Sequence, residues 1–360
     1  MIFTGGSGKE IRMKAEKKVI GKLNKCYALG MFAYDGKPHI VCAAEKQDPC
    51  YAFDLDGEKT DTLWEGPGGV MTVLQAPGDK PVLLATQKFY SPNDSAEAKI
   101  VYYTKEDSGW KCSVLCDLPF VHRFGIVEKN GRNWLIACTL KSAHAFKNDW
   151  TCPGRIWAAE LPENILQYDA DHQLKLEPLV SGLYKNHGFA VHQKEDGSTF
   201  AVVGTENGIW LCEPPAEEGG EWNCECILEE PVSDVLYLDF DGDGERELFV
   251  LSPFHGDTVS VYKKKNGSFE KVWERDKKMP FIHAIYSGKI NGKTVAFTGN
   301  RQEDMELVMI SFENGDYQVT ILDQGSGPAN CMFFEDNGVY KLAAANRETD
   351  EIALYTLKEE

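Results

Sequence analysis

The sequence predicts an all-β chain in which residues 1–360 form one domain, a seven-bladed β-propeller with four-stranded blades. Two observations lead to this prediction. Glycine-containing turns recur between short apolar segments, and they lie roughly 42 to 66 residues apart, which is the period of propeller blades. Such dipeptides supply the positive φ angles that tight hairpins need. The turns are Asp35-Gly36, Gly78-Asp79, Asn130-Gly131, Asp196-Gly197, Asp241-Gly242, Asn291-Gly292 and Asn337-Gly338.

Each turn joins two apolar strands, as residues 124–127 and 134–137 show for the third unit. A third strand follows downstream, for example at residues 259–262, and often a fourth. The third unit is the longest, and it carries an insertion at residues 142–153. The last unit ends at Glu360 after about three strands, so we expect the N-terminal segment 10–20 to complete that blade and close the ring, leaving no open edge.

Composition indicates a folded protein of the cytoplasm. The formal net charge of −18 argues against binding to nucleic acid, because the phosphates would be repelled. No apolar run is long enough for a transmembrane helix, and the N-terminus lacks the features of a signal peptide. The 11 cysteines are odd in number and show no metal-binding or disulfide spacing, which favours a reducing compartment. We therefore expect neither nucleic acid nor a membrane as a partner.

Residues 239–247 (Asp-Phe-Asp-Gly-Asp-Gly-Glu-Arg-Glu) place carboxylates at alternate positions of a tight loop. Such carboxylates converge on a hard cation, and the glycines permit the turn. The motif resembles the FG-GAP/VCBS repeat found in many propellers, with Glu where Asp is usual at its last position. The resemblance implies a structural calcium ion that stabilises the turn between the first two strands of one blade. Its ligands would be Asp239, Asp241, Asp243 and Glu247.

A column of equivalent residues predicts a site in the channel. In a propeller the first strand of each blade lines the channel, so the residues about nine positions before each turn glycine surround the axis at one depth. Three imidazoles and a carboxylate from consecutive units are a donor set for Zn, Mn or Fe(II). The alternative is hydrogen-bonded filling of the channel without a metal. The predicted metal ligands are His122, His187, Asp234 and His283, and the column also contains Tyr27, Gly69 and Ala329.

A second column follows the end of the second strand in each unit, on the same face as the start of the first strand. It supplies several cations to a protein of net charge −18, which favours an anionic ligand. The alternative is that these are solvated loop charges paired with nearby glutamates. Aromatic side chains of neighbouring loops suit the apolar faces of sugar rings. The predicted substrate-binding residues are Lys46, Lys88, Arg301, Arg347, Trp150 and Tyr90.

Together the two columns favour an enzyme that acts on carbohydrate. A metal would polarise a carbonyl or carboxylate and acidify the neighbouring C–H, and Lys141, His144 or His255 would remove that proton. The arrangement is similar to that of seven-bladed polysaccharide and oligosaccharide lyases and to the propeller of fungal aldos-2-ulose dehydratases. This resemblance implies a metal-dependent lyase that catalyses β-elimination or dehydration of an anionic or oxidised sugar.

Two other functions fit the same residues. A sugar epimerase or isomerase would begin with the same proton abstraction. A non-catalytic propeller that binds a glycan or a protein partner would not need the channel histidines. By contrast, the chain has no G-x-S-x-G motif, no P-loop and no dinucleotide fingerprint after a strand. Serine hydrolases, NTPases and dehydrogenases are therefore not favoured.

Overall fold

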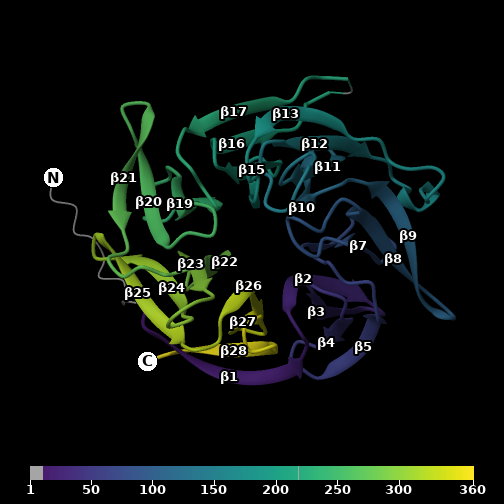
Figure 1. The fold of residues 1–360 in the computed structure, drawn as a ribbon. Helices are drawn as coiled ribbons and strands as arrows, with labels where there is room; N and C mark the ends of the chain where they lie inside the picture. The colour runs from purple at the N-terminus through teal and green to yellow at the C-terminus, as the bar shows by residue number, and fades with distance from the viewer. Residues whose placement is uncertain (1–10, 218) are drawn as a thin grey trace.

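The computed structural model describes residues 11–217 and 219–360, and it confirms the predicted all-β fold. Seven four-stranded antiparallel sheets stand around a central axis as the blades of a propeller (Figure 1). The only helix in the described part of the chain is one 3₁₀ turn, η1 (Ile165–Gln167). Nothing in the described ranges forms a helix long and apolar enough to span a membrane.

In blades 1 to 6 the four strands follow one another in the chain, and the first strand lies nearest the axis (Figure 1). Blade 1 consists of β2 (Cys26–Tyr34), β3 (Lys37–Ala44), β4 (Cys50–Phe53) and β5 (Lys59–Trp64). Blade 2 consists of β6 (Val73–Gln75), β7 (Val82–Gln87), β8 (Lys99–Glu106) and β9 (Gly109–Asp117). Blade 3 consists of β10 (Val121–Lys129), β11 (Arg132–Thr139), β12 (Gly154–Leu161) and β13 (Glu177–Leu183). Blade 4 consists of β14 (Gly188–Gln193), β15 (Thr199–Thr205), β16 (Gly208–Glu213) and β17 (Asn223–Leu228). Blade 5 consists of β18 (Asp234–Leu238), β19 (Glu247–Ser252), β20 (Thr258–Lys265) and β21 (Ser268–Glu274). Blade 6 consists of β22 (Ile282–Ile290), β23 (Lys293–Asn300), β24 (Leu307–Glu313) and β25 (Asp316–Asp323).

Blade 7 closes the ring as predicted. It combines β26 (Pro328–Asp336), β27 (Val339–Asn346) and β28 (Glu351–Glu359) with the N-terminal strand β1 (Met13–Lys22). β1 pairs antiparallel with β28, in a register that runs from Met13 opposite Glu359 to Lys22 opposite Glu351. The strand therefore begins after the first residues of the expected segment 10–20. Residue 10 of that segment lies outside the described residues. The first and last strands of the described residues thus meet in one sheet, and each of the seven described blades has four strands.

The hairpin turns lie where the glycine pattern predicts them. Asn130 and Gly131 have φ angles of 55° and 77°, and the equivalent Asn291 and Gly292 have 52° and 78°. Asparagine and glycine are the residues that adopt this left-handed region most readily, which explains their pairing at these turns. These turns join first to second strands, so they lie on the face opposite the start of the first strands.

The core lies between neighbouring blades. Second strands such as β7 are buried along their whole length, whereas fourth strands such as β5 expose their first residues. Glycines on inner strands allow the blades to interlock. A Cβ on Gly125 would lie 2.6 Å from the ring of Phe189 in the next blade, and one on Gly288 would lie 2.2 Å from Phe333. This close contact holds the inner strands, and therefore the channel side chains, in place.

Candidate functional site: a histidine cluster in the propeller channel

Four members of the predicted column sit on β-bulges: Ala329 in blade 7, and three residues with polar side chains in other blades. The pairing register shifts between Cys26 and Ala28 in blade 1, between residues 121 and 123 in blade 3, and between residues 282 and 284 in blade 6. Each shift leaves the second residue of the inner strand outside the ladder. A bulge redirects the side chain at its position. The residues at these bulges are Tyr27, His122 and His283, all members of the predicted column.

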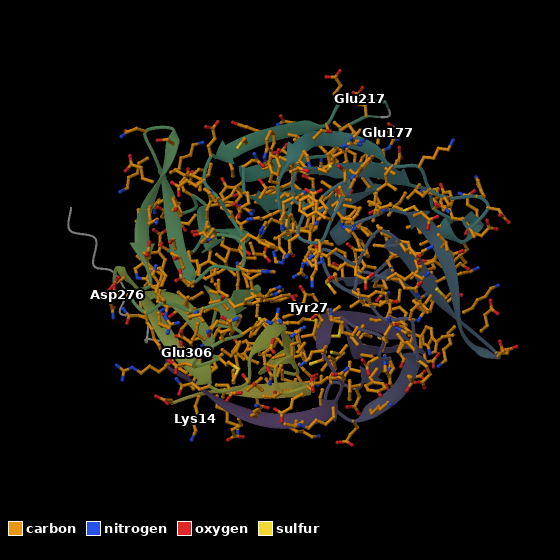
Figure 2. The ribbon with its side chains drawn as sticks, in the orientation of Figure 1. Lys14, Tyr27, Glu177, Glu217, Asp276 and Glu306 are labelled. Carbon is orange, nitrogen blue, oxygen red and sulfur yellow. The ribbon has the colours of Figure 1, made fainter. Side chains whose placement is uncertain are left out.

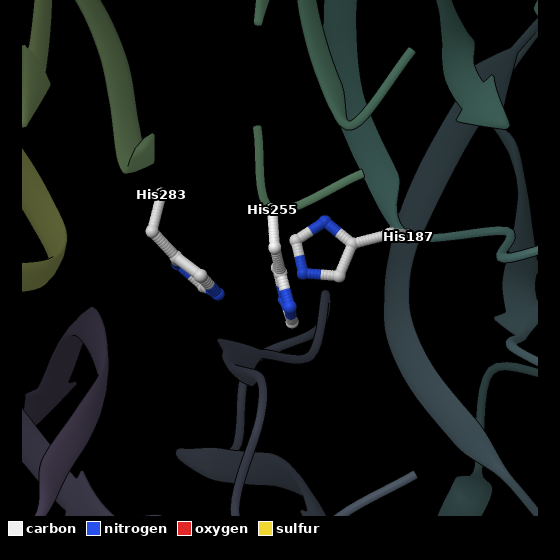
Figure 3. A group of neighbouring side chains, drawn as sticks. All are labelled: His187, His255 and His283. Carbon is white, nitrogen blue, oxygen red and sulfur yellow. The ribbon is translucent and has the colours of Figure 1, made fainter. Parts of the chain in front are cut away.

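Three imidazoles converge at the channel. His187 immediately precedes β14, His283 lies on β22, and His255 lies in the loop between β19 and β20 (Figure 3). Their ring centroids are 5.1 to 5.6 Å apart, and one nitrogen from each lies within 4.8 Å of the others. His255 adopts a left-handed backbone conformation with φ of 51°, which turns its ring toward the other two. Three nitrogen donors in this arrangement are a set that can hold a divalent transition metal.

Backbone carbonyls of the next blade fix two of these rings. The Nδ1 atom of His187 lies 3.0 Å from the carbonyl oxygen of Ser233, and that of His283 lies 2.7 Å from the carbonyl oxygen of Ala329. A carbonyl only accepts, so Nδ1 carries the proton in both rings and Nε2 presents a lone pair. Metal-binding histidines are commonly oriented by this kind of hydrogen bond. The Nε2 atom of His187 is buried and has no hydrogen-bond partner among the described residues.

Burial keeps the imidazoles uncharged. Desolvation is the main cause that lowers the pKa of His122, His187 and His283 well below the usual range of histidine. It also lowers the pKa of His255 to about 4, with Arg301 as the next contribution. Neutral imidazole is the form that binds a metal. The cluster is therefore in its ligand form at neutral pH.

Tyr27 connects the cluster to His122. Its hydroxyl oxygen lies 3.0 Å from Nε2 of His283 and 3.5 Å from Nε2 of His122. Figure 2 places Tyr27 on the inner side of its blade, beside the channel. Burial raises the pKa of Tyr27 to about 12, so the hydroxyl keeps its proton and donates it to an imidazole. His122 also lies close to His187, with 4.4 Å between ring centroids, and its Nδ1 atom is buried with no partner in the part of the chain that the structure describes.

Asp234 lies in the column, but its carboxylate is not one of the groups that converge with the three imidazoles. Its Oδ1 atom accepts hydrogen bonds from the backbone N–H groups of Phe189 and Val235, at 3.2 and 3.0 Å. Burial raises the pKa of Asp234 to about 6. The side chain thus joins the inner strands of blades 4 and 5, which positions the neighbouring His187.

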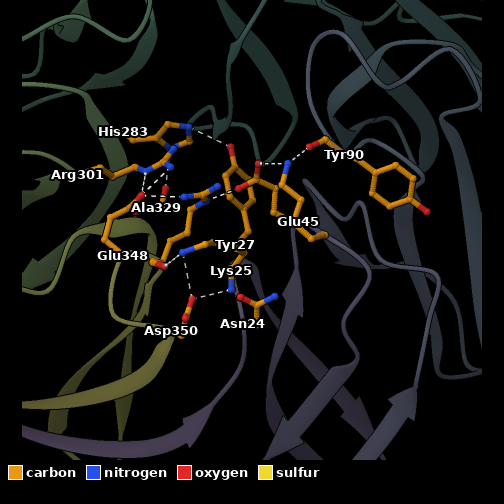
Figure 4. Close-up of polar contacts among 12 residues, drawn as sticks. Asn24, Lys25, Tyr27, Glu45, Tyr90, His283, Arg301, Ala329, Glu348 and Asp350 are labelled. Carbon is orange, nitrogen blue, oxygen red and sulfur yellow. Dashed lines mark hydrogen bonds and ion pairs between the residues drawn. The ribbon is translucent and has the colours of Figure 1, made fainter.

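Most of the predicted anion-binding residues pair with carboxylates of the protein. Arg301 contacts Glu348 at 2.7 Å (Figure 4). Arg347 contacts Glu348 at 2.9 Å and also pairs with Glu45. Lys46 lies 2.9 Å from the carboxylate of Glu45. Three cations therefore share two carboxylates at this mouth of the channel. In the second blade, Lys88 pairs with Glu97 at 2.9 Å.

The insertion between β11 and β12 brings one aromatic ring to the cluster. Trp150 meets Phe254 edge to face at 5.7 Å, and Phe254 in turn contacts His187 at 5.3 Å. Lys141 is fully buried beneath Trp150, with its ammonium 4.3 Å from the ring centroid and 2.7 Å from the carbonyl oxygen of Asp149. Burial lowers the pKa of Lys141.

The other predicted base and stacking residues lie farther out. His144 packs against Phe120, with 5.4 Å between ring centroids. Tyr90 meets this network through its backbone carbonyl, which accepts a hydrogen bond from Lys46. Within the described residues, the contacts therefore place His255 in the cluster, whereas Lys141 and His144 belong to the insertion that lies beside it.

Sequence reasoning missed Arg123, which follows His122 on β10. Its guanidinium donates to the carbonyl oxygen of Met71 at 3.3 Å and to Oδ1 of Asn330 at 3.1 Å. Its carbon Cζ lies 5.9 Å from the centroid of the Tyr27 ring. The sequence did place Arg123 directly after His122, a member of the predicted channel column. A bulge at His122 also turns the next side chain toward the channel.

The acidic loop of residues 239–247 lies between β18 and β19 on the opposite face. Asp239, Asp241 and Glu247 approach one another closely enough to hold a cation. An ammonium group from the neighbouring strand β20 is already present, because Lys263 lies 2.5 Å from the carboxylates of both Asp241 and Asp243 and 3.4 Å from that of Glu247. Asp239 accepts hydrogen bonds from the backbone of the loop. A protein cation thus contacts three of the four predicted calcium ligands.

The fold and the site define the class of this chain, a seven-bladed β-propeller with a histidine cluster in its channel. Comparison with models of known protein families and with curated protein sequences finds no match.

Proposed function

We propose that the chain is a metal-dependent carbon–oxygen lyase that catalyses β-elimination or dehydration of a sugar with a carbonyl or carboxylate group. The metal ligands in this proposal are His187, His255 and His283. A bound Zn, Mn or Fe(II) ion would polarise the carbonyl or carboxylate and acidify the adjacent C–H. The arrangement resembles that of propeller-fold lyases and dehydratases, and this resemblance is consistent with the proposed chemistry.

One observation carries the proposal. Two imidazoles have their Nδ1–H groups bound to backbone carbonyls, and one nitrogen from each lies within 4.8 Å of one from His255. At His283 a bound ion would replace the Tyr27 hydroxyl as the partner of Nε2. Histidines that only filled the channel would need partners for both nitrogens, because an unpaired buried acceptor is costly. Nε2 of His187 is buried without one. A metal ion would satisfy this lone pair.

Tyr27 and His122 supply the proton transfers in this proposal. His122 is neutral and accepts the proton from the carbon next to the polarised group, while the C–O bond breaks and a C=C bond forms. The Tyr27 hydroxyl donates its proton to the departing oxygen. The 3.5 Å contact between the two side chains then returns the proton from His122 to Tyr27 and restores both groups.

Aromatic side chains cover the cluster on the mouth side. His187 and His283 are only 1% and 2% exposed, and Phe254 and Phe281 stack on His255 with ring centroids 3.9 and 4.4 Å away. Ligand entry therefore requires these rings and Trp150 to move aside. Apolar ring faces of this kind also suit the C–H faces of a sugar.

The same burial favours one alternative, a propeller that binds a glycan or a protein partner without catalysis. In that case Tyr27 and the imidazoles fill and stabilise the channel, as the hydrogen bond between Tyr27 and His283 already does. Such a protein would hold no transition metal at the cluster, so elemental analysis separates the two functions.

The first test is elemental analysis of protein purified without an affinity metal. We expect about one transition-metal ion per chain, as in other three-histidine sites. Replacing His255 with alanine should remove most of this metal, because one of three ligands is lost. Replacing His122 with glutamine should leave the metal in place, and His172→Gln, at an exposed loop of blade 3, serves as the matched control.

The outcomes separate the ligand sets. Loss of metal in His122→Gln but not in His255→Ala would support the ligands predicted from the column instead. A wild-type protein free of transition metal would overturn the proposal. If metal is present, sugar acids and oxidised sugars are screened for the ultraviolet absorbance of a newly formed conjugated double bond, which Tyr27→Phe should abolish or strongly reduce.

A further inference from the structure

Two cysteines face each other on the outer part of blade 4, away from the channel. Cys212 lies on β16 and Cys224 on the outermost strand β17, and the antiparallel register places the two residues directly opposite each other. Residues in such a position have Cα atoms about 4.5 or 5.5 Å apart, depending on the type of pair. Both values lie within the range of about 4.4 to 6.8 Å that a disulfide spans. The sheet can therefore accept a cross-link at this position without a change of register.

The two thiols differ in burial and in acidity. Cys212 is fully buried in a hydrophobic cluster between blades 3 and 4, whereas Cys224 is only partly buried against the same cluster. Hydrogen bonding with the Cys212 side chain is the main cause that lowers the pKa of the Cys224 thiol. Hydrogen bonding with Cys224, followed by burial, raises the pKa of Cys212 well above its usual range. Cys224 is thus the thiol that ionises first, and reactive cysteines are partly exposed thiolates of this kind.

Other cysteines of the chain show what distinguishes this pair. Cys226 lies two residues farther along β17 and is also partly buried, but it faces a tryptophan across the register, and its thiol donates to a backbone carbonyl at 3.6 Å. Burial raises the pKa of Cys226. Cys42 does have a cysteine neighbour, Cys26, but both are fully buried. Cys212 and Cys224 combine a thiol partner with access from solvent.

We infer that Cys212 and Cys224 form a reversible disulfide, a modification site that exchanges with low-molecular-weight disulfides such as oxidised glutathione. The thiolate of Cys224 attacks one sulfur of the small disulfide, so that a mixed disulfide forms and one small thiolate leaves. Cys212 then loses its proton to water and attacks the sulfur of Cys224, which forms the protein disulfide and releases the second small thiolate. The protein dithiol is oxidised by two electrons, and the small disulfide is reduced to two thiols.

Mass spectrometry of wild-type protein equilibrated with glutathione buffers tests this inference. As the fraction of oxidised glutathione rises, we expect a cross-link between residues 212 and 224, which disappears when reduced glutathione is restored. Cys226→Ser, the matched control on the same strand, should form the same cross-link. In the reduced wild type, iodoacetamide at neutral pH should alkylate Cys224 about 10-fold faster than Cys226, because a lower pKa gives more thiolate.

Two variants separate the two steps of the exchange. In Cys212→Ser we expect Cys224 to accumulate as a mixed disulfide with glutathione, because serine cannot displace the small thiol. Cys224→Ser should leave Cys212 unmodified, because the remaining thiol is buried and inert. The second variant also covers the case in which substitution of the buried residue prevents folding, since position 224 is only partly buried.

Two results would overturn the inference. One is a wild-type protein that keeps both thiols free over the whole range of glutathione buffers. The other is a cross-link from Cys224 to Cys226 or to Cys138 in place of Cys212, which would show that the strand register does not direct the reaction. The site lies on the outer strands of its blade, so neither result bears on the metal proposed for the channel.

Discussion

At the scale of single residues, several histidine side chains of this protein are buried, and burial favours their neutral form. His192 on β14 is a clear case outside the channel cluster. Its Nε2 atom accepts a hydrogen bond from the backbone N–H of Tyr237 at 3.1 Å, which requires an unprotonated nitrogen. Burial, followed by the charge of Arg246, lowers the pKa of His192 to about 3. Protonation would break the hydrogen bond and place a charge in the core.

The pKa of His192 predicts loss of stability in acid. In the unfolded chain the pKa of His192 is that of an ordinary histidine, about 6.5. At pH values between this pKa and the lower pKa of the folded state, the unfolded chain binds a proton that the folded chain does not. The contribution of His192 is therefore fully present above pH 6.5 and declines as pH falls, by up to about 1.4 kcal/mol per pH unit. In His192→Gln the amide oxygen keeps the hydrogen bond but does not titrate. Urea unfolding between pH 7 and pH 4 should show that the wild type loses free energy of unfolding relative to the variant as pH falls, whereas parallel pH profiles would contradict this assignment.

At the scale of secondary-structure elements, the hairpin between β18 and β19 shows how a strand can supply what an ion would otherwise provide. Glu247 is fully buried, and burial raises its pKa. The ammonium group of Lys263 on β20 pairs with the carboxylates of Asp241, Asp243 and Glu247. Burial lowers the pKa of Lys263, but the carboxylates have the larger combined effect and raise it. The turn is thus stabilised by an ion pair within the blade.

This arrangement predicts that calcium and Lys263 compete. Calcium should leave the thermal midpoint of the wild-type protein unchanged. Lys263→Met removes the ammonium, so it should be destabilised in chelator and regain about 2 to 3 kcal/mol when calcium reaches a hundred times its dissociation constant. Lys264→Met, an exposed neighbour on the same strand, is the control. Stabilisation of wild type by calcium would show instead that the ion displaces the lysine, as the acidic motif suggests.

At the scale of the whole molecule, ring closure depends on β1. Without this strand β28 would be an open edge, and a sheet edge of this length favours aggregation. The two strands end side by side, since Met13 pairs with Glu359 and the backbone N–H of Glu360 donates to the carbonyl of Arg12 at 3.0 Å. A short linker can therefore join the C-terminus to β1 as a hairpin.

Circular permutation tests this closure. A chain of residues 24–360 should fail to unfold cooperatively or should lose more than about 10 °C in its midpoint, because one blade lacks a strand. A permutant that continues from Glu360 through a glycine–serine linker into residues 11–23 should recover a midpoint near that of wild type. Cooperative unfolding of the truncated chain at the wild-type temperature would show that β1 is dispensable.

Much of the fold could be predicted from the sequence, because local physics determines it. Asn-Gly and Asp-Gly turns between short apolar strands specify hairpins, and the period of these hairpins specifies the number of blades. The same period identified the column with Tyr27, His122 and His283, since equivalent positions of a repeat lie at one depth. The repeat period does not predict the β-bulges that turn these side chains toward the axis.

The sequence by itself therefore determined the seven hairpin repeats, the strand that completes blade 7 and the positions that face the channel. Tertiary structure alone decided which of these groups meet. His255 joins His187 and His283 because its loop has a left-handed backbone, and Lys263 reaches the acidic loop from another strand. Arg301 and Arg347 have carboxylate partners, whereas the hydrogen bonds of Arg123 go to neutral groups. Charge pairing and convergence depend on distances between residues far apart in the chain, and only the folded ring sets those distances.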